Sequence, residues 1–364
     1  MSFVPHSDAD RRAMLSKVGV ADVEDLYSDI PAGLRLGRDL DVPTALSEWE
    51  AVRGVVELAA RNAELVSFAG GGMYDHYVPA AVDHIIRRSE FYTAYTPYQP
   101  EVAQGTLQVI YEFQTMICEL TGMDVANASM YDGPTATAEA TVMARSVRRR
   151  DRVFAARSLH PHSRKVTNTY LEGLGNELEL IDYGPDGLLD LDALKGALAA
   201  SDDDVAAVLV QYPNFFGGIE SLAPIAEAVH EAGALLVVQA DPVLLPVLRS
   251  PGALGADVVT AEGQPLGNPP SYGGPVVGLF AASEKLVRKM PGRIVGATVD
   301  EEGRRGYVLT LQTREQQIRR ERATSNICTN QGLMALAATV YMALVGRSGL
   351  RQVAETSIQN AHYA

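Results

Sequence analysis

The sequence predicts an α/β fold in which a mostly parallel sheet is covered by helices on both faces. From residue 151 onward, short apolar strands alternate with helices of about 10–15 residues, which is typical of a parallel sheet. The segments at residues 205–213 and 234–241 are continuously apolar, as strands buried on both faces are. We expect two parts, a helical N-terminal arm (residues 1–45) and a large domain (residues 46–364).

The arm is predicted to contain two short helices. Ser7 or Asp8 suits the N-cap of the first, and Pro31 and Pro43 break the chain beyond the second. An arm of this kind either wraps a partner subunit or remains a mobile terminus, and the sequence leaves both open. The start lacks the apolar core of a secretion signal, and no run of about 18 apolar residues is present, so we expect a cytoplasmic protein that does not bind membranes.

An aromatic loop organises the first half of the large domain. After a helix over residues 46–62, tyrosines and prolines are interleaved in residues 92–104, which we call the tyrosine loop. Proline fixes φ and removes a backbone donor, so this loop is predicted to be irregular and rigid. A helix over residues 106–121 comes next and ends at Gly122.

The second half carries the alternating strands and helices. A helix over residues 134–148 precedes them. The strands are expected at residues 152–156, 177–183, 205–213, 234–241, 256–263 and 275–283, and the helices between them at residues 160–173, 190–200 and 222–233. The last strand comes after a turn and is one that can run antiparallel. A hairpin is expected with its tip at residues 301–306, an exposed helix at residues 314–322, and two apolar helices at residues 332–346 and 349–364.

Composition excludes several functions. A formal charge of −14 argues against nucleic acid as a partner. Cys118 and Cys328 are the two cysteines, and they indicate reduced thiols. His160 and His162 alone have the spacing of metal ligands, and nothing nearby supports them, so we predict no metal site.

The order of elements suggests an enzyme that uses pyridoxal phosphate (PLP). Asp132, Gly133 and Thr135 form a turn that enters a helix, and a helix N-terminus binds anions such as phosphate. Asp241 ends a buried strand, where a carboxylate would keep the pyridine nitrogen protonated. Capping of the next segment is an equally good explanation for Asp241.

The lysine that such an enzyme needs is missing. The chain has only five lysines, and none lies between Asp241 and Gly278, where the covalent anchor of the cofactor is expected. Lys285 comes after a further strand, in a segment that has the pattern of an exposed amphipathic helix. A stand-alone PLP enzyme therefore conflicts with the sequence.

Arginines are concentrated near the C-terminal end of this acidic chain. Arg293 and Arg314 are candidates for binding carboxylates or phosphates, together with Thr324, Ser325 and Asn326 in the adjoining polar stretch. An exposed, solvated helix is the simpler explanation for the arginines of residues 319–322.

Several long motifs point to one family. They include HSDADRRAMLSKVGV, TAYTPYQPEVAQGTLQ, ELTGMDVANASMYDGPTATAEA, EGQPLGNPPSYGGP and MPGRIVGATVDEEGRRGYVLTLQTREQQIRRERATSNICTNQ. From about residue 5 to its end, the chain resembles subunit 1, the N-terminal-half subunit, of the glycine decarboxylase P-protein of the glycine cleavage system. The resemblance implies the large domain of a type I (aspartate aminotransferase-like) PLP-dependent transferase, with a seven-stranded type of sheet.

The resemblance also implies a reaction and partners. The P-protein decarboxylates glycine with PLP and transfers the aminomethyl group to the lipoyl arm of H-protein. The PLP lysine is carried by a sister chain, subunit 2, in an assembly expected to be α2β2, so this chain alone is expected to be inactive. Arg322 stands where most relatives have lysine, which keeps the charge. Relatives continue past the AHY motif into a small C-terminal domain, so we expect a shortened chain.

The tyrosine loop is the best candidate for this subunit's share of the active site. Tyr95 and Tyr98 are expected to reach the glycine and PLP pocket of the sister subunit, with Gln99, Glu101 and Gln104 as polar neighbours. Two alternatives remain open: these tyrosines only pack the interface, or the chain is a non-catalytic binding or scaffold protein on the same fold.

Overall fold

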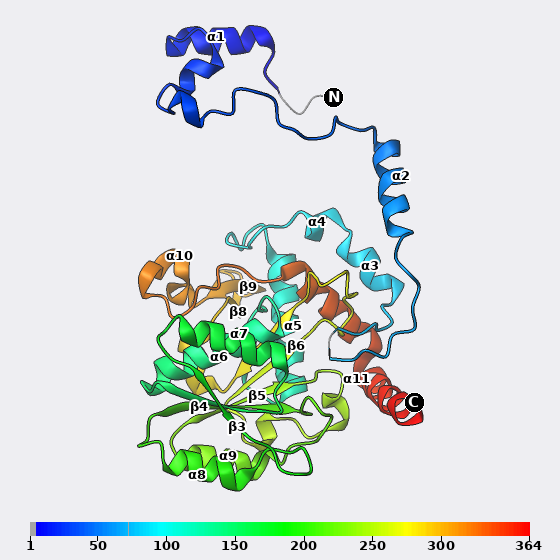
Figure 1. The fold of residues 1–364 in the computed structure, drawn as a ribbon, viewed down its shortest axis with the longest axis vertical. Helices are drawn as coiled ribbons and strands as arrows, with labels where there is room; N and C mark the ends of the chain where they lie inside the picture. The colour runs from blue at the N-terminus through cyan, green and yellow to red at the C-terminus, as the bar shows by residue number, and fades with distance from the viewer. Residues whose placement is uncertain (1–4, 72) are drawn as a thin grey trace. The chain divides into compact units, whose positions relative to one another are not determined.

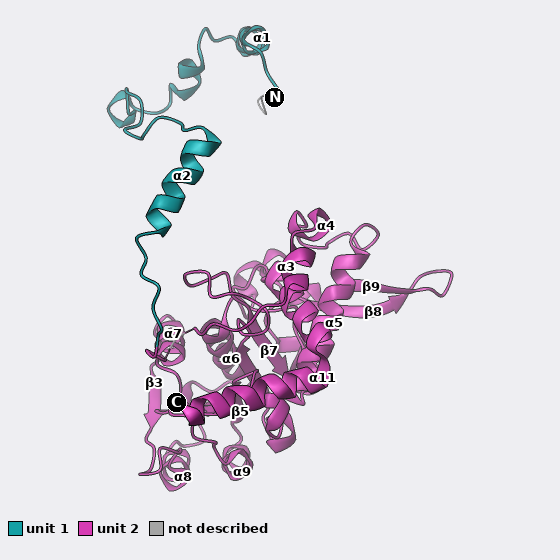
Figure 2. Cartoon of the chain, turned by 90° about the vertical axis from the view of Figure 1, so that its right-hand side faces the viewer, with its two compact units in different colours: residues 1–67 teal, residues 68–364 magenta. Residues whose placement is uncertain are grey.

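The computed structural model describes residues 5–71 and 73–364 and divides into two compact units, residues 1–67 and 68–364 (Figure 2). The division falls after Ser67. The helix α2 (Glu48–Ala59) therefore lies in the first unit, although the sequence predicted the boundary at residue 45.

The first unit consists of short, individually capped helices. Besides α2 it contains α1 (Asp8–Val18), η1 (Val23–Tyr27) and η2 (Ala32–Leu34), where η denotes a 3-10 helix. Ser7 caps α1 and Ser47 caps α2, each in a capping box with the acidic residue three positions later. None of the residues of α1 and α2, all of which the structure describes, is buried. Local capping therefore defines these helices, with no core of their own beneath them.

The second unit is built on a mixed sheet (Figure 1). In its described part, seven strands lie in the order β1-β7-β6-β5-β4-β2-β3. They are β1 (Val125–Ala126), β2 (Arg152–Ala156), β3 (Leu178–Ile181), β4 (Val205–Tyr212), β5 (Leu235–Ala240), β6 (Val258–Glu262) and β7 (Gly278–Ala282). The strands from β2 to β6 are parallel, and β7 is antiparallel to β6, both as expected from the sequence.

Helices cover the two faces of the sheet. Those of the second unit are α3 (Ala80–Ile86), α4 (Ser89–Tyr92), α5 (Gln104–Thr121), α6 (Gly133–Arg148), α7 (Pro161–Glu172), α8 (Leu191–Ala199), α9 (Leu222–Glu231), α10 (Gln316–Arg319) and α11 (Gly332–Tyr363). The shorter turns are η3 (Leu245–Val247), η4 (Gly252–Leu254), η5 (Glu284–Lys289), η6 (Gln312–Arg314) and η7 (Arg320–Arg322). Figure 1 shows α6 and α7 on one side of the sheet and α8 and α9 on the other.

Side chains alternate between the two faces along each strand, so the core is divided into two layers. Val208 and Val210 of β4 pack in the cluster that contains residues of α5, α8, α9 and α11, whereas Ala207 and Leu209 pack in the cluster formed with α6 and α7. Successive side chains of a strand point to opposite faces, so a strand covered on both sides must be apolar at every position. The continuous apolar runs of the sequence have this cause.

The last helix, α11, contains a break at Gly346 (φ 62°, ψ −176°), which separates the two apolar helices expected from the sequence. Its length and composition alone would suit a membrane span. However, Ala335, Leu336, Tyr341 and Met342 pack in the core against the sheet, which is the position of a core helix in a globular unit.

One expectation for the arginine-rich region is wrong. Residues 314–322 do not form one exposed helix: α10 ends at Arg319, and Arg320 adopts φ 53°, which a helix does not accommodate. The segment around Lys285 is an amphipathic helix as expected, in the form of the 3-10 helix η5, in which Leu286 is buried while Lys285, Arg288 and Lys289 are exposed. The predicted hairpin is present as β8 (Ile294–Val299) paired with β9 (Arg305–Thr310).

Candidate functional site

The turn before α6 has its backbone donors engaged within the chain. Asp132 caps the helix: its Oδ1 accepts from the Thr135 N–H at 2.7 Å, and the Asp132 N–H donates to Thr135 Oγ1 at 3.2 Å. The Gly133 N–H donates to Glu262 Oε2 at 2.9 Å, and Pro134 has no N–H to offer. The predicted phosphate turn is therefore present, but its donors are used by two carboxylates of the same chain.

Glu262, the last residue of β6, was not predicted as a site residue. Its Oε1 accepts from the Gln264 N–H at 2.9 Å. Burial, and to a lesser extent the negative charge of Asp132, raises the pKa of Glu262 to about 7. The sequence shows only a glutamate at the end of an apolar strand, which gives no sign that it reaches a helix 129 residues away in the chain.

Asp241 comes directly after β5 and caps the segment beyond it. The Val243 N–H donates to Asp241 Oδ1 at 2.9 Å, and the Leu244 N–H donates to the Asp241 carbonyl at 3.2 Å. Burial raises the pKa of Asp241, while these backbone donors and the nearby His76 act in the opposite direction. The capping role left open from the sequence is therefore present, in the place where a pyridine partner was expected.

The residues of the turn before α6 and of the ends of β5 and β6 do not fit PLP. The cofactor requires free phosphate donors and a lysine, whereas the donors here are engaged and the lysine is missing. Lys285 pairs with Asp257 at 2.8 Å, and Lys289 lies 3.4 Å from Ser146 Oγ. A phosphate brought to this turn would meet the carboxylates of Asp132 and Glu262.

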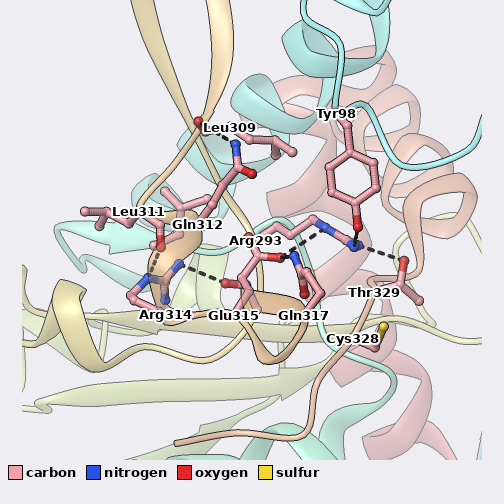
Figure 3. A network of polar contacts seen from close by, with 12 residues as sticks. Tyr98, Arg293, Leu309, Leu311, Gln312, Arg314, Glu315, Gln317, Cys328 and Thr329 are labelled. Atoms are coloured by element: carbon pink, nitrogen blue, oxygen red, sulfur yellow. Dashed lines mark hydrogen bonds and ion pairs between the residues drawn. The ribbon is translucent and has the colours of Figure 1, made fainter. Parts of the chain in front are cut away.

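The tyrosine loop is held from below by Arg293, which immediately precedes β8 (Figure 3). Arg293 Nη2 donates to the Tyr98 hydroxyl at 3.2 Å, and its guanidinium lies 5.6 Å from the centre of the Tyr98 ring. Nη1 donates to Thr329 Oγ1 at 2.8 Å, and Nε lies 3.6 Å from Glu315 Oε2. Arg293 is 3% exposed and Glu315 is 6% exposed. The predicted anion-binding arginine is thus a buried connection between the loop, Glu315 and Thr329.

The other loop residues divide into anchors and exposed side chains. Gln104 joins the loop to β9, since its Nε2 donates to the carbonyls of Pro100 and Tyr307 at 2.8 and 2.9 Å, and its Oε1 accepts from the Tyr307 N–H at 2.9 Å. Gln99 and Glu101 are exposed. Tyr95 is 85% exposed, whereas Tyr98 is 44% exposed.

The other candidates of the arginine-rich region are Arg314 and the polar residues 324–326. Arg314 donates to the carbonyls of Leu311, Met290 and Gly292, so its fork is used by the backbone. Thr324 and Ser325 line a small depression with it.

Local hydrogen bonds also engage the two residues after Thr324. The Ile327 N–H donates to Ser325 Oγ at 3.1 Å, and Gln316 Nε2 donates to Asn326 Oδ1 at 3.5 Å. The end of this polar stretch approaches the segment before α6, since the Cys328 N–H donates to the Tyr131 hydroxyl at 3.2 Å.

Solved structures with the same fold define the class of protein. They include mouse CSAD in apo form (14% identity, TM-score 0.64, 94% of this chain and 72% of that chain) and Oryza sativa TDC with PLP and tryptamine (14% identity, TM-score 0.62, 96% and 77%). The chain has the fold of type I PLP-dependent enzymes, as expected.

Closer comparisons identify the family. The model of the glycine cleavage system P-protein family matches residues 1–364, so the chain belongs to this family. Proteins named probable glycine dehydrogenase (decarboxylating) subunit 1 are 58% identical in Desulforamulus reducens and 53% identical in Moorella thermoacetica, each over 100% of this chain and 81% of the relative. The inhibitor-bound crystal structure of glycine decarboxylase (P-protein) of the glycine cleavage system is 46% identical with a TM-score of 0.91, covering 100% of this chain and 81% of that one. The resemblance found in the sequence is confirmed.

We expect replacement of Arg293 by Gln to destabilise the second unit by about 3–5 kcal/mol, because Glu315 would be left buried without its partner. The double variant Arg293→Gln/Glu315→Gln should lose less than the sum of the two single variants. Urea unfolding of the purified chain measures the free energy of unfolding of the single and double variants. Arg304→Gln, which breaks an exposed pair with Asp300, is the matched control and should have little effect. An Arg293→Gln variant as stable as the parent would contradict this role.

Proposed function

We propose that this chain is the subunit of a glycine-decarboxylating P-protein that does not hold the cofactor, and that it completes the active site of a lysine-bearing sister subunit. The observation that carries the proposal is the turn before α6: a chain that belongs to the P-protein family has no lysine between β5 and β7, and the backbone donors of this turn are engaged by Asp132 and Glu262. PLP held by the sister subunit supplies the electron sink for decarboxylation. The relatives' name, subunit 1, supports the existence of a second subunit.

The proposal also includes a substrate, an acceptor protein and an assembly. Glycine is the substrate, lipoylated H-protein accepts the aminomethyl group, and the two subunits form an α2β2 assembly in the cytoplasm. Each of these is part of the proposal and rests on family membership.

The tyrosine loop is this chain's contribution to the shared site. Tyr95 and Val102 are 85% and 81% exposed and line the same open hollow, so a partner that covers it would bury apolar surface. The loop is nevertheless fixed, because Arg293 holds Tyr98 and Gln104 holds its C-terminal end. A cavity of about 160 Å³ beside it, lined in part by Tyr95 and Leu336, offers space for side chains of the sister subunit.

A rigid loop that presents phenol groups suits recognition of a small carboxylate. The Tyr95 hydroxyl can donate to a glycine carboxylate or a cofactor phosphate, while its ring excludes water. Tyr98 differs, since its hydroxyl already accepts a hydrogen bond from Arg293. Packing of the interface by these rings, without any contact to substrate, is the competing interpretation.

Co-purification tests the assembly. A tagged copy of this chain, expressed in its native cell, should retain a second chain of the same fold that carries a lysine after the strand equivalent to β6. Glycine–bicarbonate exchange should require both chains together. Exchange activity in this chain alone, or recovery of no such partner, would contradict the proposal.

Replacement of Tyr95 by Phe tests the loop, because it keeps the ring and removes only the hydroxyl. We expect assembly to persist and glycine–bicarbonate exchange to fall roughly tenfold, the scale of one hydrogen bond lost in the transition state. Tyr98→Phe should reduce exchange similarly and also release Arg293. Tyr363→Phe, at the 95% exposed end of α11, is the control. If both loop variants assemble and turn over like the parent, the loop only packs the interface.

A further inference from the structure

Side chains of this chain occupy the turn before α6, beside the end of β6. Cofactor sites of this fold place a phosphate at the N-terminus of α6, where backbone N–H groups and the helix dipole favour an anion. Here the anion at that position is a side chain, since Glu262 Oε2 accepts from the Gly133 N–H at 2.9 Å. Asp132 accepts from the next available donor, the Thr135 N–H.

We propose that the Glu262 carboxylate is an internal replacement for the phosphate group of PLP, so that this chain excludes the cofactor by occupying its site as well as by lacking the lysine. The inference rests on the fold and on these contacts, and it holds whatever the sister subunit does.

Close packing supports this replacement. A Cβ built on Gly133 would lie 2.8 Å from the backbone N of Glu262 and 2.9 Å from its Cβ, so the first residue of α6 directly contacts the end of β6. A Cβ on Gly278 of β7 would lie 2.4 Å from the Asp132 carbonyl oxygen. These approaches leave the turn no room for a tetrahedral anion unless the Glu262 side chain moves away.

Electrostatic repulsion also disfavours a phosphate at this turn. A phosphate at the turn would face Asp132 and Glu262, and like charges at such distances repel strongly in a buried site. The Glu262 carboxylate is itself costly to bury, as the rise of its pKa to about 7 shows. The Gly133 and Gln264 N–H groups offset part of that cost, so the glutamate and the helix N-terminus satisfy each other.

Gly71 and His76 approach residues that follow β4 and β5. The His160 ring is edge-on to the Phe215 ring, with 5.1 Å between the ring centres. A Cβ on Gly71 would lie 3.5 Å from the Phe215 ring. His76, on the same loop, interacts electrostatically with Asp241. Gly71 thus lies close to the Phe215 ring and His76 lies near Asp241, while Gly72 lies outside the described residues.

Removal of Glu262 should uncover an anion site. The full chain and its Glu262→Ala variant are unfolded by heat in chloride and in excess inorganic phosphate at equal ionic strength. We expect phosphate to raise the Tm of Glu262→Ala by roughly 2–4 °C more than that of the parent, because it binds the freed N–H groups of the folded state. Glu139→Ala is the matched control, since Glu139 is also a buried glutamate with a pKa raised to about 7, but it lies inside α6. It should respond to phosphate as the parent does.

The Glu262→Gln variant keeps the test decisive if Glu262→Ala does not fold. It preserves size and removes the charge, so phosphate should stabilise it by a smaller amount of the same sign. A response to phosphate equal to that of the parent in every folded Glu262 variant would overturn the proposal. An equal response in Glu139→Ala and Glu262→Ala would do the same, because it would show a general effect of lost charge.

Discussion

The hydrogen bond between the Gly133 N–H and the Glu262 carboxylate joins the beginning of α6 to the end of β6. Our proposal that the second unit does not bind PLP depends on this contact. In a cofactor-binding protein of this fold, a ligand makes that connection. Here the chain makes it with its own side chain, at the cost of a buried carboxylate. The N-terminus of α6 is therefore satisfied without a ligand, and the sheet, the helix and β7 can pack directly against one another.

This contact accounts for our proposal that a chain of the P-protein family, with the fold of PLP-dependent enzymes, leaves the cofactor to a partner. The seven-stranded sheet and both helical layers are complete in the described residues of the second unit. On the tyrosine loop, which we propose as this chain's share of the active site, Tyr95 is 85% exposed. Arg293 and Gln104 fix that loop from the side of β8 and β9, so its tyrosines can meet a partner without a large loss of conformational entropy.

The sequence predicted the elements well wherever hydrophobic period and glycine or proline signals agree. The strands from β2 to β7 were predicted from their apolar runs, and the break in α11 from Gly346. It failed where contacts between distant residues decide the outcome. Glu262 meets Gly133, and Arg293 meets Tyr98 and Glu315, across separations that no local pattern reveals. Arg293 and Arg314, predicted to bind anions, donate to protein groups within the chain, and burial makes such pairing necessary because unpaired buried donors are costly.

The most direct measurement locates the cofactor lysine. The assembled enzyme is loaded with PLP, reduced with borohydride, digested and mapped by mass spectrometry. If this chain leaves the cofactor to its partner, pyridoxyl-lysine appears only in peptides of the sister subunit. A stoichiometric label on any lysine of this chain, namely Lys17, Lys165, Lys195, Lys285 or Lys289, would contradict that division of labour.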